Sequence, residues 1–331
     1  MDSTNGNGIS TAGILQNHSL KHSDLWLKKA GAGQRPPVHL EQQEVFTQSI
    51  LEIMLFPIDA PWYVYLAMPF VIFGRYFLLC SWLFGLFYLW KQRQWLFRKI
   101  QQRFPRRADY RREVGYSALT ALIFGLVVAL CLGTPLRAYT TVYTDISEYG
   151  IPYLIFSVVL ILFLHDTYFY WMHRLMHHPK VYRHVHLVHH KSVNPSPWAA
   201  YAFHPLEAVI EAGILPLVLF TLPVHPVAMI SFITIMLWFN VYGHLGYELF
   251  PARVYAHPLG RWLNSGVYHN LHHERFNGNY SLYFTCWDRW MGTLRTDSAE
   301  KVAEVQNRIR QHNAKPCSTP SSAAVADSSP T

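Results

Sequence analysis

The stretch IPYLIFSVVLILFLHDTYFYWMHRLMHH, residues 151–178, joins two kinds of sequence without a break. Its first half, residues 151–164, is an apolar run that predicts a membrane-spanning helix. Its second half carries His173 and His177 at the i, i+4 spacing by which a helix offers two imidazoles from one face to a metal ion. The stretch therefore predicts a membrane protein whose metal chemistry lies close to the end of a span.

The composition of the whole chain supports a membrane protein. Hydrophobic residues make up 51% of the 331 positions and charged residues only 15%, whereas soluble chains carry about 25% charged residues. Three further stretches are apolar: residues 62–90, residues 116–135 and residues 206–242. The last of these is broken at LPVHP (222–226) and indicates a helical hairpin, two short spans or a re-entrant pair. We therefore expect an all-α, integral membrane helical bundle of about four spans, with a His-rich catalytic cap on the cytosolic side.

The positive charge of the chain is concentrated in one segment. The net charge is +8, and residues 91–114 contain nine Lys or Arg against Asp109 and Glu113. A basic loop between two apolar stretches is typical of the cytoplasmic side of a membrane, which favours a role in topology over nucleic-acid binding. Anionic lipid or an acidic protein is an alternative partner. With this loop in the cytoplasm, the later spans bring every His-rich segment to the cytosolic face.

Composition also divides the chain into four parts. Residues 1–43 are polar and predicted to be poorly ordered, and residues 44–149 hold the first membrane helices and the basic loop. Residues 150–295 hold the third apolar stretch, the helical hairpin region and most of the histidines, and residues 296–331 are expected to form a short helix and a disordered tail. The four cysteines lie far apart in the sequence, so we expect neither a disulfide framework nor a thiolate metal site.

One histidine spacing occurs twice, in VHLVHH (185–190) and in YHNLHH (268–273). At the histidine frequency of this chain, the pattern is expected by chance only roughly 0.06 times. On a helix the three histidines of each copy lie on one face. With His173 and His177, the repeats supply eight imidazoles, too many for one ion, and this predicts two ions with three or four histidines each.

The kind of metal is only partly determined by these residues. Imidazole suits zinc, iron, copper and nickel, but a structural zinc needs four ligands and no repeat of the motif. Two ions beside a membrane favour oxidative chemistry on a lipid. A non-redox zinc protein and a catalytically silent lipid-binding protein remain as alternatives. Asp166 shares a helical face with His173 and His177 and is a candidate to fix an imidazole tautomer, with Asp288 and Glu274 as further candidates.

Two longer stretches identify a family resemblance. HDTYFYWMHRLMHHPKVYRHVHLVHH (165–190) resembles the first two histidine boxes of the fatty acid hydroxylase / sterol desaturase superfamily, and YHNLHHERFNGNYSLYFTCWDRWMGTLR (268–295) resembles the third box. The resemblance covers roughly residues 150–295. It implies an integral membrane enzyme with a non-haem di-iron site facing the cytosol, which uses O2 to hydroxylate or desaturate a lipid.

The resemblance also implies a ligand set and partners. The predicted iron ligands are His173, His177, His186, His189, His190, His269, His272 and His273. His165 and His244 are further candidate ligands, and Glu248 stands where some relatives have another histidine. Two iron ions, O2 and a lipid substrate are expected, with electrons from NAD(P)H delivered by a separate protein such as cytochrome b5. No nucleic-acid partner is expected.

HDTYFYWMHR and WDRWMGTLR favour the sterol desaturase type, with a C-5 sterol desaturase as the preferred activity and a fatty acid or other lipid hydroxylase as the alternative. The expected location is the endoplasmic reticulum, or the inner membrane in a bacterium. Six aromatic residues are candidates to line a lipid cavity, although each one singly is more typical of core packing or of an interfacial belt: Tyr168, Tyr170, Trp171, Phe203, Trp238 and Tyr242.

Overall fold

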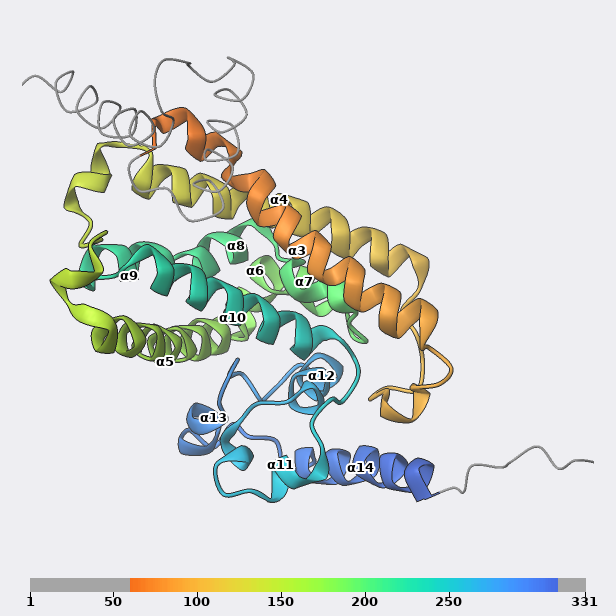
Figure 1. Cartoon of the computed structure of the whole chain (residues 1–331). Helices are drawn as coiled ribbons and strands as arrows, with labels where there is room; N and C mark the ends of the chain where they lie inside the picture. Colours follow the sequence, from red (N-terminus) through yellow and green to blue (C-terminus); the bar gives the residue numbers. More distant parts are fainter. Residues whose placement is uncertain (1–59, 315–331) are drawn as a thin grey trace, which may run out of the picture. The chain divides into compact units, whose positions relative to one another are not determined.

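The computed structural model describes residues 60–314. The predicted N-terminal segment 1–43 and most of the predicted tail lie outside these residues, and the division into four parts stays a prediction. Within the described range every extended regular element is a helix, and β-structure is limited to isolated bridges. Figure 1 shows long helices above a group of short helices and loops formed by the C-terminal third. The predicted all-α class is confirmed.

Four helical stretches are long and apolar enough to cross a membrane, which confirms the expected number of spans. They are Trp62–Trp90, which contains α3 (Met68–Phe84), and the helices α4 (Arg107–Leu132), α5 (Gly150–Met176) and α10 (Pro226–His244). Large apolar side chains on these helices are exposed, including Phe70, Leu78, Ile151 and Val159. Exposed apolar side chains are suited to contact with lipid. The helical backbone can also lie in hydrocarbon, because each helix satisfies its own backbone hydrogen bonds. The chain is therefore an integral membrane protein.

The helix α4 begins inside the basic segment that was expected to be a loop. The backbone N–H of Arg106 donates to Asp109 Oδ2 at 3.0 Å, and the Arg112 guanidinium donates to Asp109 Oδ1 at 2.7 Å. An acidic residue in the first turn stabilises a helix start. Residues 107–114 are consequently helical, and this part of the loop prediction is wrong. The helix ends at Leu132, with Gly133 following.

The helix α5 is longer than the predicted span at residues 151–164. It continues without a break to Met176, so His165 and His173 are residues of the spanning helix itself. A helix of 27 residues is about 40 Å long, more than the hydrocarbon thickness of a bilayer. Its last turns can therefore carry imidazoles beyond the apolar part of the span.

The predicted hairpin over residues 206–242 contains three helices: α8 (Pro205–Ala212), α9 (Ile214–Thr221) and α10. The break at LPVHP is confirmed, because α9 ends before it and α10 begins at its last proline. The division between α8 and α9 falls at Gly213, where a Cβ would collide with the Tyr168 hydroxyl. That hydroxyl donates to the Ile210 carbonyl at 2.6 Å and joins α5 to α8.

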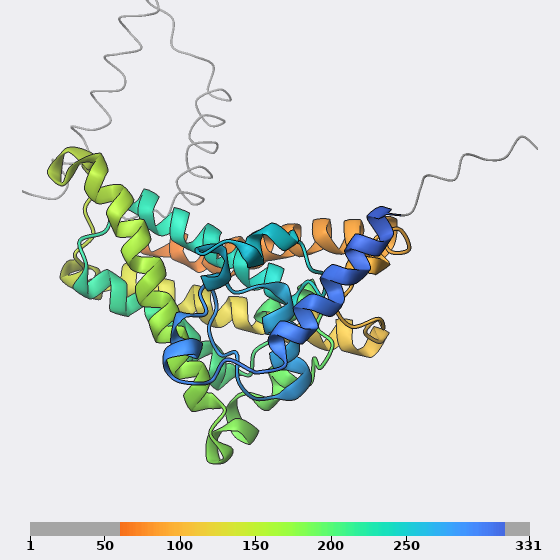
Figure 2. The same ribbon diagram turned by 90° about the horizontal axis from the view of Figure 1, so that it is seen from below.

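Two short helices and a C-terminal cap complete the surroundings of the site. The short helices α6 (Pro179–Val185) and α7 (Leu187–His190) follow α5 directly. The cap consists of α11 (Ala252–Ala256), α12 (Gly266–Arg275), α13 (Cys286–Trp290) and α14 (Ser298–Ala314). Helix α12 packs against α10 and α14. Seen from below, the cap helices lie in front of the long helices (Figure 2).

Candidate metal centre

Nine histidines from α5, the α6–α7 segment, α10 and α12 converge in two groups. Within each group, one ring nitrogen of every histidine lies within 4.8 Å of those of the others. The first cluster contains His173, His177, His186, His190 and His272, and the second cluster contains His189, His244, His269 and His273. The eight box histidines and His244 therefore lie where metal ions can bind, while their assignment as ligands stays a prediction.

Each copy of the repeated spacing contributes to both clusters. His186 and His190 belong to the first cluster and His189 to the second, whereas His269 and His273 belong to the second and His272 to the first. The three rings of each copy do lie together, with centroids 4.6–5.7 Å apart, but they divide between the two clusters. Consecutive helix positions diverge by about 100°, so adjacent histidines such as His189 and His190 point to different sites.

Backbone carbonyls fix the tautomers in the first cluster. His173 Nδ1 donates to the Tyr280 carbonyl at 2.8 Å, and His272 Nδ1 donates to the Gly278 carbonyl at 2.7 Å. A carbonyl oxygen only accepts, so each Nδ1 carries the hydrogen and each neutral ring keeps a lone pair on Nε2. His173 Nε2 lies 3.0 Å from His186 Nε2. Such converging lone pairs are suited to a shared cation.

The second cluster is built around His244 in the same way. His244 Nδ1 donates to the Asn240 carbonyl at 2.7 Å, one turn earlier in α10. Its Nε2 lies 3.2 Å from His189 Nε2, 3.0 Å from His269 Nε2 and 3.1 Å from His273 Nε2. Ligand nitrogens about 2.0–2.1 Å from a metal ion are separated from one another by about 3 Å. The donor set therefore fits a metal ion.

Burial keeps these imidazoles neutral. Loss of solvation, followed by the proximity of other histidines, lowers the pKa of His186, His190 and His272 well below the usual range, and the same causes act on His189, His269 and His273. Burial and the neighbouring His173 lower the pKa of His177 to about 2. The neutral form is the one that binds metal ions.

Two other candidate ligands lie outside both clusters. His165 Nδ1 pairs with the Tyr283 hydroxyl at 2.8 Å, two turns before His173 on α5. Glu248 accepts from the Tyr242 hydroxyl at 2.9 Å and from the backbone N–H of Phe250 at 2.6 Å. Glu248 therefore organises the loop between α10 and α12.

The Asp166 carboxylate has different partners from those expected. It accepts from the backbone N–H groups of Leu282, Tyr283 and Phe284, at 3.2, 2.7 and 3.4 Å. A loop segment of the cap, not an imidazole ring, occupies the position beside this face of α5. Within the described range, the proposed direct contact of Asp166 with a box histidine is therefore absent.

Of the two further acidic candidates, Asp288 supports the first cluster indirectly. Its carboxylate accepts from the backbone N–H groups of Tyr280 and Ser281, both at 2.9 Å. The Tyr280 carbonyl in turn orients His173. Glu274 is half-buried at the end of α12, and its carboxylate makes no hydrogen bond or ion pair within residues 60–314.

Sequence reasoning missed Glu207, the carboxylate that does contact a box histidine. Its Oε1 lies 2.7 Å from His186 Nδ1, and both side chains are buried. Burial raises the pKa of Glu207 well above its usual range, and a cation held by His186 would oppose this shift by favouring the carboxylate. Acidic residues are rare in the apolar stretch after His204. An acidic residue at position 207 could therefore have been recognised from the sequence as a candidate for the site.

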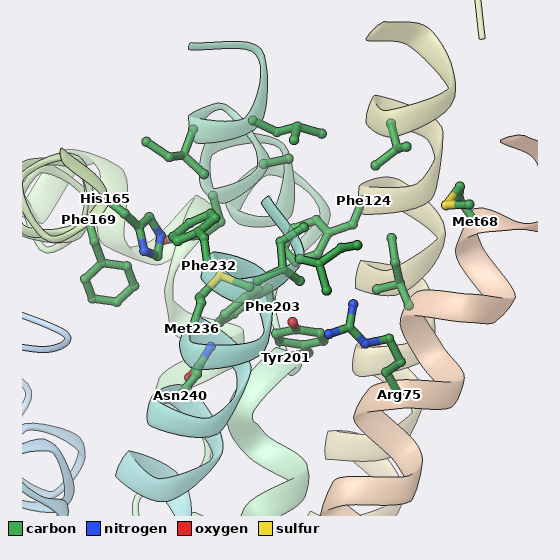
Figure 3. Close-up of a pocket in the computed structure, with 18 of the residues that line it drawn as sticks. Met68, Arg75, Phe124, His165, Phe169, Tyr201, Phe203, Phe232, Met236 and Asn240 are labelled. Atoms are coloured by element: carbon green, nitrogen blue, oxygen red, sulfur yellow. The ribbon is translucent and has the colours of Figure 1, made fainter. Parts of the chain in front are cut away.

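An apolar cavity lies next to both clusters (Figure 3). Phe169 and Phe203 line it, and their rings lie 5.0 Å from the His173 ring and 5.1 Å from the His189 ring, respectively. Figure 3 shows His165 and Phe169 at one side and Arg75, beside Tyr201, at the other. A lipid chain in this cavity would lie one aromatic ring away from each cluster.

The prediction of cavity-lining aromatics is confirmed for Phe203 only. The other five candidates are absent from the described lining of this cavity: Tyr168, Tyr170, Trp171, Trp238 and Tyr242. Trp171 and Trp238 are instead 40% and 46% exposed. Such side chains suit the outer surface of a membrane protein.

Comparisons with known proteins agree with this geometry. The pattern of the family described as "Fatty acid hydroxylase" matches residues 158–293. A Delta(7)-sterol 5(6)-desaturase of Gibberella zeae is 36% identical over 50% of this chain and 49% of its own length. A second Delta(7)-sterol 5(6)-desaturase, from Aspergillus fumigatus, is 34% identical over 58% of this chain and 68% of its own length. Human lathosterol oxidase is 30% identical over 57% of this chain and 62% of its own length.

The chain thus spans between about half and two thirds of these relatives. No significantly similar solved structure was found. The matched region contains all nine clustered histidines and the cavity-lining rings Phe169 and Phe203. On the motifs, the helical membrane fold and these similarities, the chain belongs to the fatty acid hydroxylase / sterol desaturase superfamily.

Proposed function

We propose that the protein is an O2-dependent membrane oxidoreductase that introduces a double bond into a sterol. The observation that carries this proposal is the shared wall between the apolar cavity and the two histidine clusters, formed by Phe169 and Phe203. The names of the similar proteins, sterol desaturases and lathosterol oxidases, support a sterol as substrate. Iron bound by the histidines would supply the oxidation of an unactivated C–H bond.

We assign the five histidines of the first cluster to one iron ion and the four of the second cluster to the other. Carbonyls of Tyr280, Gly278 and Asn240 hold three of the rings in the tautomer that offers Nε2 to the metal. Glu207 provides the same support for His186. This assignment adds His244 to the eight box histidines and leaves His165 at the cavity.

The cavity walls orient the substrate and exclude water. Their apolar side chains, including Phe232, Ile233 and Met236 of α10, favour the rings or tail of a lipid. The chain's own residues bind metal and lipid, so we further propose that electrons come from a separate donor protein such as cytochrome b5. The proposed location is the endoplasmic reticulum membrane, with the clusters on the cytosolic side next to the basic segment 91–114.

A fatty acyl substrate is a second candidate, and Arg75 favours it. Its guanidinium lines the cavity and donates to Thr234 Oγ1 at 2.7 Å, and it forms no ion pair with an acidic side chain within residues 60–314. A half-buried cation that faces an apolar cavity is stabilised by a negative partner. The carboxylate of a fatty acid would provide one.

Expression in a fungal strain that lacks its own Delta(7)-sterol 5(6)-desaturase tests the proposal. We expect Δ7-sterols to decrease and Δ5,7-sterols to appear, with two iron ions per purified chain. His189→Ala should abolish the change in sterols. The matched control His184→Ala alters an exposed histidine of α6 and should leave it intact.

Three outcomes would contradict the proposal. Zinc as the only metal, with turnover that needs no O2, would refute the oxidative chemistry. An unchanged sterol profile with a new hydroxylated fatty acid would favour the fatty acyl candidate. A lipid profile that is the same with wild-type protein and with His189→Ala would indicate a silent binding protein.

A further inference from the structure

We infer that Glu211 and Asn240 bind a hydroxyl group of the lipid substrate and thereby select the carbon that is oxidised. The inference rests on the proposed function and assigns a specific task to two polar side chains of the cavity. Both residues line the cavity, one from α8 and the other from α10. Neither residue is a candidate metal ligand.

Glu211 is a buried carboxyl group without a partner. It is 8% exposed, and its side chain makes no hydrogen bond or ion pair within residues 60–314. Most of the cavity wall around it is apolar, including Ala212, Ile214 and Leu215. Buried polar groups are nearly always hydrogen-bonded, because leaving one unpaired is costly. A ligand in the cavity is the partner that the surrounding protein does not provide.

Asn240 presents a second polar group to the same space. It is 6% exposed, and its backbone carbonyl accepts from His244 Nδ1. Its side-chain amide has no hydrogen-bond partner in the described part of the chain. Figure 3 shows the amide on the helix that also carries Phe232 and Met236 into the cavity. An amide both donates and accepts hydrogen bonds, and so does a hydroxyl group.

Both polar groups lie close to the clusters. Glu211 follows Glu207, the partner of His186, by one helical turn, and Asn240 precedes His244 by one turn. One turn advances a helix by about 5–6 Å. A hydroxyl held here therefore lies only a few carbon atoms from a carbon that faces the clusters. This arrangement suits a compact ring alcohol and disfavours a chain oxidised far from its headgroup.

The charge state of Glu211 suits a neutral ligand. Burial raises the pKa of this carboxyl group to about 8, so the protonated form predominates at neutral pH. A protonated carboxyl group donates one hydrogen bond and accepts another, as an alcohol partner requires. It offers no negative charge to attract a cationic substrate.

The test compares two substrates in membranes that contain the full chain with iron and an electron donor. One is a Δ7-sterol with a free 3-hydroxyl, and the other is its 3-O-methyl ether, which cannot donate a hydrogen bond. For the wild-type protein we expect kcat/KM to be about tenfold higher for the alcohol than for the ether. A tenfold difference corresponds to about the free energy of one hydrogen bond lost at a buried site. Glu211→Leu and Asn240→Leu should each bring this ratio towards one, while Glu211→Gln retains most of it.

Iron content and thermal unfolding of each variant show whether it is folded and loaded. Val209→Ala changes a side chain of α8 that is 55% exposed, and it should keep the wild-type ratio. An unchanged ratio in both leucine variants, with iron retained, would overturn the inference. If Glu211→Leu does not fold, the alcohol-to-ether ratio of Asn240→Leu decides. A wild-type ratio in folded, iron-loaded Asn240→Leu would then overturn the inference, and a ratio near one, with Glu211→Gln close to wild type, would support it. Absence of wild-type activity on either sterol would instead refute the proposed function.

Discussion

At the scale of single residues, the groups that orient the histidines are as much a part of the site as the histidines themselves. Four of the nine rings have a described hydrogen bond from Nδ1, and the acceptors are three backbone carbonyls and Glu207. Each contact fixes which nitrogen faces the cluster. The sequence motifs predict the ligands, and the tertiary structure determines the tautomers of these four rings.

Replacing Glu207 tests this supporting role. We expect Glu207→Leu to weaken iron binding in the first cluster by about 10- to 100-fold, the usual effect of losing the partner of a metal-bound histidine. Iron content after dialysis against a weak chelator measures the effect. Glu300→Gln, on the exposed face of α14, is the control. Equal iron retention in Glu207→Leu and the control would show that His186 needs no partner.

At the scale of elements, the cap segment 280–284 connects α5 to the first cluster. Asp166 holds its later residues, Asp288 holds Tyr280 and Ser281, and the Tyr280 carbonyl orients His173. The i, i+3 and i, i+4 spacings predicted eight of the nine histidines that converge in the two clusters. They did not predict the role of Asp166, because its partner is a loop more than one hundred residues later in the sequence. Glu207 was missed for a different reason: it reaches His186 from a separate helix, α8, and no helical spacing links the two positions.

The segment 280–284 should lose its position when Asp288 is replaced. Asp288→Ala leaves the N–H groups of Tyr280 and Ser281 and the Thr293 hydroxyl without their carboxylate. We expect a loss of about 2–3 kcal/mol in unfolding free energy and release of iron at a lower chelator concentration than in the wild-type protein. Thermal unfolding and titration with a chelator measure the two effects. Wild-type iron retention in Asp288→Ala would contradict this supporting role.

Helix packing offers a test that is independent of the metals. Gly125 of α4 lies so close to Pro69 of α3 that a Cβ would overlap the proline ring and backbone nitrogen. Gly125→Val should force the helices apart and destabilise the protein by about 1–3 kcal/mol. Gly115→Val, where a Cβ meets no neighbour, is the matched control. Equal unfolding temperatures for the two variants would show that this contact tolerates a side chain.

At the scale of the whole molecule, metal ions should contribute strongly to stability. The nine imidazoles are brought together from the spans and from the cap, and several Nε2 atoms approach one another at 3.0–3.2 Å. Without a cation, neutral lone pairs at these distances repel. We therefore expect chelation to lower the temperature of thermal unfolding in detergent, and iron to restore it. An unfolding temperature that does not respond to chelation would argue against metal in these clusters.

The alternation of ligands within each histidine repeat has a consequence for assembly. His189 lies between His186 and His190 on one short segment, and His272 lies between His269 and His273 on α12. When one cluster gains its ion, it immobilises both segments and so pre-arranges the ligands of the other. The second ion then binds to a site whose ordering has already been achieved, and loading should be cooperative. Half-filled molecules would be scarce in a titration with ferrous iron, and the protein would pass from empty to full in a single sigmoidal step.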